Sequence, residues 1–91
     1  MADAVHRPLV SLVIPVLDEA QGIRDCLLAL EPLRGEAEIL VVDGGSSDGT
    51  RGFAAPLCDR VISAPKGRAL QMNTGAEQAR GRFLLFLHSD T

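Results

Sequence analysis

The sequence has no long hydrophobic run and no signal-peptide core. A membrane-spanning helix needs about 18 or more consecutive apolar residues, and no stretch of this 91-residue chain approaches that length. The segment from Met1 to Pro8 lacks the apolar core that directs secretion. These absences argue against an integral membrane protein, and we expect a cytoplasmic protein without a transmembrane segment.

Cysteine and basic charge are also scarce. Cys26 and Cys58 stand far apart and outside any C-x-x-C pattern, so we expect two reduced, structural thiols. The net charge is −3, so the chain lacks the basic surface typical of nucleic-acid-binding proteins, and we expect no nucleic-acid partner. The apolar content of 46% and the length of 91 residues fit one globular domain.

Four segments of strand length are present. Leu9–Ile14, Ile39–Val42 and Phe83–Leu87 are nearly continuous apolar runs, which are typical of strands covered on both faces in parallel sheets. Arg60–Ser63 is a weaker fourth candidate. Helical patterns are expected between these strands, at residues 19–33, 50–57 and 67–80. The order β-α-β-α-β-α-β predicts an α/β fold with three layers around a parallel sheet.

Glycine and proline residues lie at the ends of, or inside, the expected helices. Gly35 stands just beyond the first helix as a stop signal. Gly52 and Pro56 interrupt the second, which Ser47 or Asp48 would cap. Gly75 lies inside the third, where its cost of up to about 1 kcal/mol indicates close packing or close backbone approach.

Polar residues follow each of the four strands. They lie at positions 15–19, 43–50, 64–68 and 88–90. Ligands of open α/β sheets bind beyond the carboxyl ends of the strands. Three of these groups carry carboxylates and one carries Lys66 and Arg68, so together they suit a ligand with hydrogen-bond donors, phosphates and a metal ion. Taken one by one, these groups also fit purely structural roles. Asp43–Thr50 could form a strand-to-helix turn, and Lys66 and Arg68 could be solvated surface charges.

Four motifs in order resemble the nucleotide-sugar-binding half of an inverting family-2 glycosyltransferase with the Rossmann-like GT-A fold. They are V-I-P-V-L-D-E (13–19), V-V-D-G-G-S-S-D-G-T (41–50), Asn73-Thr74-Gly75 with Ala79-Arg80-Gly81, and L-F-L-H-S-D-T (85–91). The resemblance covers nearly the whole chain from Leu9 onward. It is closest to a bacterial subgroup with H-x-D-T in place of D-x-D.

The resemblance implies a role for six residues. Pro15 and Glu19 would line the nucleoside pocket, and Asp43 would accept a hydrogen bond from the base, with Gly44 allowing close approach of the backbone. Arg68 would lie near the base or the diphosphate, and Asp90 would bind a divalent cation, Mg²⁺ or Mn²⁺. The expected ligand is a nucleotide-diphosphate sugar, with a UDP-sugar as the first candidate, and the expected strand order is 3-2-1-4.

The sequence departs from the usual motifs at three positions. Asp18 replaces an Asn, Gly44 replaces the second Asp of D-D-G-S, and His88 replaces the first Asp of D-x-D. No catalytic base or acceptor site is recognisable. Residues 1–91 are therefore interpreted as one partial domain, the donor-binding portion of a glycosyltransferase, and the chain alone is expected to transfer no sugar.

Two other interpretations stay open. The chain fits a stand-alone α/β module, either a nucleotide-binding or a receiver-type signalling domain, although it lacks the late-strand Lys of a receiver. It also fits a non-functional fragment that associates with itself. Self-association is expected in any case, through the apolar last strand Phe83–Leu87, whose open edge resembles a template for another chain.

Overall fold

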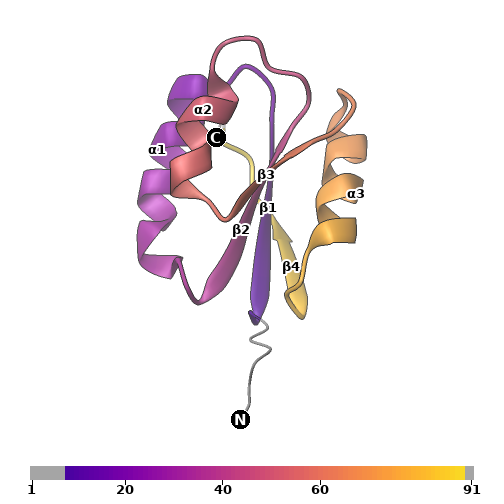
Figure 1. The fold of residues 1–91 in the computed structure, drawn as a ribbon. Helices are drawn as coiled ribbons and strands as arrows, with labels where there is room; N and C mark the ends of the chain where they lie inside the picture. The colour runs from indigo at the N-terminus through magenta and orange to yellow at the C-terminus, as the bar shows by residue number, and fades with distance from the viewer. Residues whose placement is uncertain (1–7, 90–91) are drawn as a thin grey trace.

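A computed structural model describes residues 8–89 as a four-stranded parallel sheet flanked by helices (Figure 1). The sheet order is β3-β2-β1-β4, which confirms the predicted fold class and strand order. The elements, in chain order, are β1 (Val10–Val16), α1 (Ala20–Leu30), η1 (Glu31–Leu33), β2 (Ala37–Asp43), α2 (Thr50–Ala54), η2 (Ala55–Leu57), β3 (Arg60–Ser63), α3 (Arg68–Gln78) and β4 (Phe83–Phe86). No helix within residues 8–89 is long and apolar enough to cross a membrane.

The two faces of the sheet carry two separate cores. Helices α1 and α2 cover one face and α3 covers the other (Figure 1). Successive side chains of a strand point to opposite faces, so Leu12 and Ile14 belong to the core under α1 and α2, whereas Val13 and Leu40 belong to the smaller core under α3. Strands β1 and β2 are thus covered on both faces, as their continuous apolar runs predict.

Gly75 lets α3 lie close to the sheet. A Cβ atom at this position would lie 2.4 Å from Cγ1 of Val13 and 3.0 Å from Cγ2 of Val42. Real Cβ contacts are not that short, so any larger residue would push α3 away from β1 and β2. The prediction of close packing at Gly75 is confirmed.

The first two helices are shorter than predicted. Residues 19–33 form α1 up to Leu30 and then the 3₁₀ helix η1, which contains Pro32. Residues 50–57 divide in the same way, because Pro56 lies in the 3₁₀ helix η2. Proline has no N–H group for the i to i−4 ladder, so the α-helix gives way to a tighter turn near it. Gly35 has a φ of 93°, which suits the predicted stop before β2.

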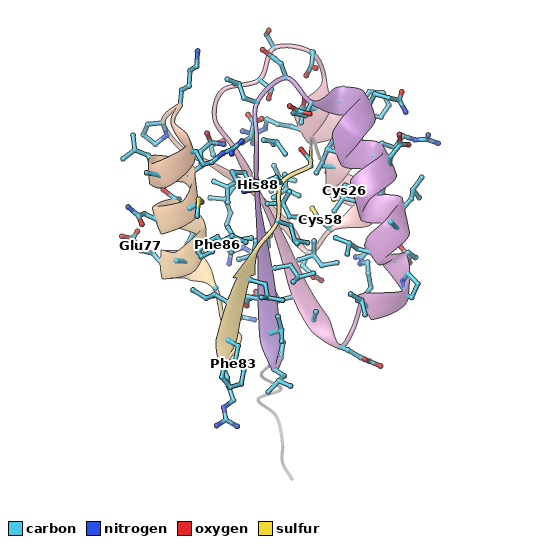
Figure 2. The ribbon with its side chains drawn as sticks, turned by 180° about the vertical axis from the view of Figure 1, so that it is seen from behind. Cys26, Cys58, Glu77, Phe83, Phe86 and His88 are labelled. Atoms are coloured by element: carbon cyan, nitrogen blue, oxygen red, sulfur yellow. The ribbon has the colours of Figure 1, made fainter. Side chains whose placement is uncertain are left out.

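Strand β4 is exposed, and the expectation that it is covered on both faces is wrong. Relative exposure is 59% for Phe83, 39% for Leu84, 53% for Leu85 and 38% for Phe86. Strand β4 lies at the edge of the sheet, where it pairs with β1 alone, and its side chains belong to neither core. Figure 2 shows Phe83 and Phe86 on this strand.

Candidate functional site

The loop after β2 folds around the carboxylate of Asp43. One carboxylate oxygen, Oδ2, accepts hydrogen bonds from the backbone N–H groups of Gly45 (3.1 Å) and Ser46 (3.0 Å). The other, Oδ1, accepts a hydrogen bond from the hydroxyl of Ser46. Asp43 is 1% exposed, so this buried carboxylate is well supplied with donors and has a fixed orientation.

The hydroxyl of Ser46 also joins this loop to the loop after β1. It accepts a hydrogen bond from the backbone N–H of Asp18 (2.8 Å) while it donates to Asp43. In return, Oδ1 of Asp18 accepts a hydrogen bond from the backbone N–H of Ser47 (2.8 Å). Asp18 has a φ of 50°, a left-handed conformation that Asp and Asn adopt more readily than most residues. Ser47, one of the two predicted caps of α2, therefore acts here through its backbone alone.

A second hydroxyl makes the same kind of connection at the start of α2. The Thr50 hydroxyl accepts from the backbone N–H of Glu19 (2.9 Å) and donates to Asp48. Asp48 also accepts from the backbone N–H groups of Thr50 (3.0 Å) and Ala20 (3.3 Å). The hydrogen bond from the Thr50 hydroxyl lowers the pKa of Asp48. Asp48 thus bonds the first N–H of α2, although the N-cap position itself is held by Gly49.

These hydrogen bonds explain why small and acidic residues follow the buried strand β2. Two carboxylates, each bonded to a hydroxyl, fix the loop after β2 against the loop after β1. The register pairs Val16 with Asp43 and Asp43 with Ser63. The carboxyl ends of β1, β2 and β3 therefore meet at one rigid edge of the sheet.

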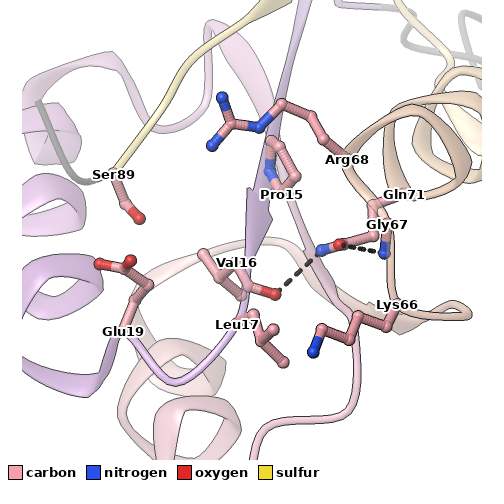
Figure 3. A pocket seen from close by; sticks show the side chains of 9 residues that line it. All are labelled: Pro15, Val16, Leu17, Glu19, Lys66, Gly67, Arg68, Gln71 and Ser89. Carbon is pink, nitrogen blue, oxygen red and sulfur yellow. Dashed lines mark hydrogen bonds between the residues drawn. The ribbon is translucent and has the colours of Figure 1, made fainter.

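A cavity of about 220 Å³ opens at this edge (Figure 3). Glu19 and Ser89 lie on one side of it, and the start of α3 lies on the other. Its lining residues are Pro15, Val16, Leu17, Glu19, Lys66, Gly67, Arg68, Gln71 and Ser89. The side chains of Lys66 and Arg68 make no hydrogen bond or ion pair with any residue in the described segment. The cavity therefore has two cations available for an anionic ligand.

The structure brings together three of the six predicted site residues. Pro15, Glu19 and Arg68 line the cavity. Asp43 and Gly44 lie at the end of β2 and are buried, outside the lining set. Asp90 lies outside the described residues.

Gln71 lines the cavity and was not among the predicted site residues. The residue is 4% exposed, and its Nε2 donates hydrogen bonds to the backbone carbonyls of Val16 and Val42, both at 2.9 Å. Its Oε1 accepts from the backbone N–H of Gly67 at 3.2 Å. One signal was available in the sequence: Gln71 precedes Gly75 by four residues, and so lies on the helix face that packs closely on the sheet.

The described part of the chain contains an incomplete set of side-chain ligands for a divalent cation. Residues 8–89 contain no group of three His, Cys, Asp or Glu side chains placed to hold a metal ion. Glu19 is the carboxylate that lines the cavity. The next carboxylate in the sequence is Asp90, just beyond the described residues.

Cys26 and Cys58 are both free thiols (Figure 2). Burial raises the pKa of Cys26. Burial, with the nearby charge of Asp59, raises the pKa of Cys58 to about 11. Thiols with raised pKa values stay protonated at neutral pH and make poor nucleophiles, which fits a structural role.

Comparison with family models gives one match over most of the chain. The model described as Glycosyl transferase family 2 matches residues 11–91. Among curated proteins, the chain is 37% identical to Glycosyltransferase AglE of Haloferax volcanii and 36% identical to the PGL/p-HBAD biosynthesis glycosyltransferase of Mycobacterium bovis, each over 91% of the chain. The matched regions make up 31% and 36% of those two proteins.

The fold also matches solved structures. Glucosyl-3-phosphoglycerate synthase from Mycobacterium tuberculosis, crystallised with Mn²⁺, UDP and glucosyl-3-phosphoglycerate, superimposes with a TM-score of 0.81 at 27% identity. The match covers 92% of this chain and 34% of that one. The chain thus spans about a third of the length of the proteins it matches.

Proposed function

Because this chain belongs to glycosyl transferase family 2, we propose that it is the donor-binding portion of an enzyme that transfers a sugar from a nucleotide diphosphate to an acceptor hydroxyl. One observation carries the proposal: Lys66 and Arg68 enter the cavity at the carboxyl ends of the strands without partners among the described residues. In open α/β sheets this is where nucleotides bind, and two such cations suit a diphosphate.

The nucleoside would lie between the end of β1 and the end of β2. Pro15 supplies an apolar wall and Glu19 a carboxylate on the opposite side of the cavity from α3. We assign Asp43 as the acceptor for the base. A carboxylate offers about four lone-pair positions, and three are taken by Gly45 and Ser46. The remaining position would accept a donor such as the imide N–H of uracil, which has to reach a carboxylate that is 1% exposed and outside the cavity lining in this structure. On this assignment we propose a UDP-sugar as the ligand.

The solved relative with 27% identity binds Mn²⁺ together with UDP, and we propose that this protein also uses Mg²⁺ or Mn²⁺. Asp90 is the proposed ligand. A divalent cation at the diphosphate would stabilise negative charge on the leaving group. The residues of this chain would bind and orient the donor: Lys66 and Arg68 at the phosphates, and Asp43 at the base.

We place the acceptor site and the catalytic base outside this chain, in the two thirds of the relatives that it does not match. Within residues 8–89, Glu19 is the one carboxylate that lines the cavity, and we assign it to the nucleoside pocket, not to proton transfer. We therefore predict that the purified chain transfers no sugar when given donor and Mn²⁺. Turnover at a normal enzymatic rate would contradict this assignment.

We also propose a cytoplasmic location. The two free thiols, Cys26 and Cys58, are in keeping with a reducing compartment. Fractionation of the producing cells, followed by immunodetection, would test this.

Calorimetric titration with UDP, with and without Mn²⁺, tests the main proposal. We expect binding by the wild-type chain and expect Asp43→Ala to weaken it by about 1–3 kcal/mol, the usual cost of removing a partner from a buried hydrogen bond. Asp25→Ala is the matched control, because Asp25 is exposed on α1 and outside the UDP cavity. Equal UDP affinities in all three chains would remove Asp43 from the site, and no binding by the wild type would overturn the proposal.

We propose in addition that the chain pairs with a second copy through β4. The edge of this strand is open, and its four side chains are all more than a third exposed. An exposed apolar edge without an internal charge or proline is a template for another strand. Light scattering at about 100 μM would show a dimer or larger species if this is right. A monomer whose Phe83–Phe86 amides are well protected from hydrogen exchange would contradict it.

A further inference from the structure

The floor of the cavity is held by a buried side-chain amide. Gln71, in the first half of α3, contacts three backbone segments that are distant in sequence: the ends of β1 and β2, and Gly67. We infer that Gln71 is a positioning residue, which holds the Lys66–Arg68 segment at the distance from the strand ends that a diphosphate needs. This inference rests on the proposed donor-binding function.

The hydrogen-bonding groups of Gln71 fit their surroundings. The carbonyl oxygens of Val16 and Val42 require donors, and Nε2 donates a hydrogen bond to each at 2.9 Å. Figure 3 shows the bond to Val16. The N–H of Gly67 requires an acceptor, which Oε1 supplies at 3.2 Å. A carboxylate would keep the acceptor and lose both donors. A thioether would lose all three hydrogen bonds.

Gly67 is held from both sides by the same residue. Its N–H donates to the side chain of Gln71, and its carbonyl accepts from the backbone N–H of Gln71 at 2.8 Å. This resembles a capping box, in which a side chain reaches back to the N–H of the N-cap residue, although here the reach is four residues. Gly67 is the N-cap residue of α3 and, as a glycine, has no side chain that could make a capping hydrogen bond.

The held residue lies between the two free cations. Gly67 has a φ of 137°, a conformation that favours glycine, and its neighbours Lys66 and Arg68 are exposed. Because Gln71 bonds both the N–H and the carbonyl of Gly67, it fixes the backbone from which the side chains of Lys66 and Arg68 extend. Preorganised cations bind an anion more tightly than cations on a loose loop, because less conformational freedom is lost on binding.

Gly44 confirms how closely the amide is enclosed. A Cβ atom at position 44 would lie 2.8 Å from Oε1 and 2.9 Å from Cδ of Gln71. The glycine in the second position of D-G-G-S, where the resembling motif has an Asp, therefore leaves room for this amide. The end of β2 and the start of α3 fit one another at this contact.

The test separates phosphate binding from nucleoside binding. Uridine and UDP affinities are measured by NMR titration for wild type, Gln71→Met and Gln71→Glu, with Gln78→Met as the control at the far end of the same helix. Hydrogen exchange of the Gly67 amide is followed in each chain. Both variants at Gln71 are included because one of them can fail to fold.

We expect Gln71→Met and Gln71→Glu to weaken UDP binding about tenfold, with uridine binding changed less than about twofold and, in Gln71→Met, faster exchange at Gly67. In a chain that also carries Lys66→Ala and Arg68→Ala, Gln71→Met should change UDP affinity less than about twofold. Gln78→Met should behave as wild type.

Equal losses for UDP and uridine would overturn the inference, since they would show a general loss of structure. Unchanged UDP affinity in a folded Gln71 variant would also overturn it, while leaving the donor-binding function intact. Absence of UDP binding by the wild-type chain would overturn both, so the two failures are distinguishable.

Discussion

Strands β2 and β4 have similar apolar sequences and opposite environments. The run Ile39–Val42 is completely buried, whereas every residue of Phe83–Phe86 is more than a third exposed. At the end of β2 the loop is hydrogen-bonded through Ser46 and Asp48 to the loop after β1. Strand β2 lies between β1 and β3 and contributes to the cores on both faces of the sheet, whereas β4 lies at the edge and contributes to neither core. The stability of the chain should therefore reside in the centre of the sheet, and β4 should be available for other contacts.

The largest effect should come from truncating a leucine in the central strand. Leu40→Ala removes a fully buried side chain of β2 and should lower the free energy of unfolding by about 2–5 kcal/mol, the usual range for such a cavity. Leu85→Ala makes the same change on β4, where the side chain is 53% exposed, and should cost less than about 1 kcal/mol. Urea denaturation at low protein concentration measures both. Equal losses would mean that β4 is covered in solution.

This contrast shows how far the sequence predicts the fold. Continuous apolar runs identify strands and imply cover on both faces, and for β1 and β2 the implication is correct. The same pattern in Phe83–Leu87 leads to a wrong expectation about burial, because periodicity cannot distinguish a central strand from an edge strand. Edge position follows from strand order, which in turn was predicted from the family resemblance.

The cavity likewise contains residues that the sequence predicts and one that it does not. Pro15, Glu19 and Arg68 were predictable, because they follow strands and the carboxyl ends of parallel strands share one edge. Gln71 was not, because its partners are two backbone carbonyls 55 and 29 residues away. A buried amide that bonds main-chain atoms has no short motif, so the tertiary structure is needed to find it.

A smaller loss is expected from removing one hydroxyl beneath the site. Thr50→Val replaces a fully buried hydroxyl by a methyl group of similar size and leaves the N–H of Glu19 without its acceptor. The cost should be about 1–3 kcal/mol. Thr74→Val is the control: its hydroxyl bonds the Leu70 carbonyl in an exposed turn of α3, so its loss should stay within about 0.5 kcal/mol. Thermal and urea unfolding of both variants, compared with wild type, would measure the difference.

Two glycine substitutions should have effects of opposite sign. Gly75→Ala places a methyl group 2.4 Å from Val13 Cγ1, and overpacking of about 1–3 kcal/mol should exceed the helix-propensity gain of up to about 1 kcal/mol. Gly52→Ala lies in α2 with no heavy atom within 4 Å of the new Cβ, so the propensity gain should appear alone and stabilise the chain. Stabilisation by both changes would show that α3 packs on the sheet more loosely than the structure indicates.

The smallest effect should be present at neutral pH and disappear in acid, and it concerns the hydrogen bonds of Asp48 between the loops after β1 and β2. The hydrogen bond from the Thr50 hydroxyl lowers the pKa of Asp48. A carboxyl group whose pKa is lower in the folded state than in the unfolded state stabilises the fold fully above its unfolded pKa of about 4, and this contribution disappears as the pH falls through the folded pKa. Asp48→Asn should therefore remove part of the stability loss between about pH 4 and pH 2, and the wild-type and variant unfolding curves should converge as the pH falls. Asp25→Asn, at an exposed position on α1, is the control and should leave the acid limb unchanged. Because Asp48 is exposed and its interactions are screened by solvent, the difference should be small, and parallel acid limbs in wild type and Asp48→Asn would show that this carboxylate does not help to hold the two loops together.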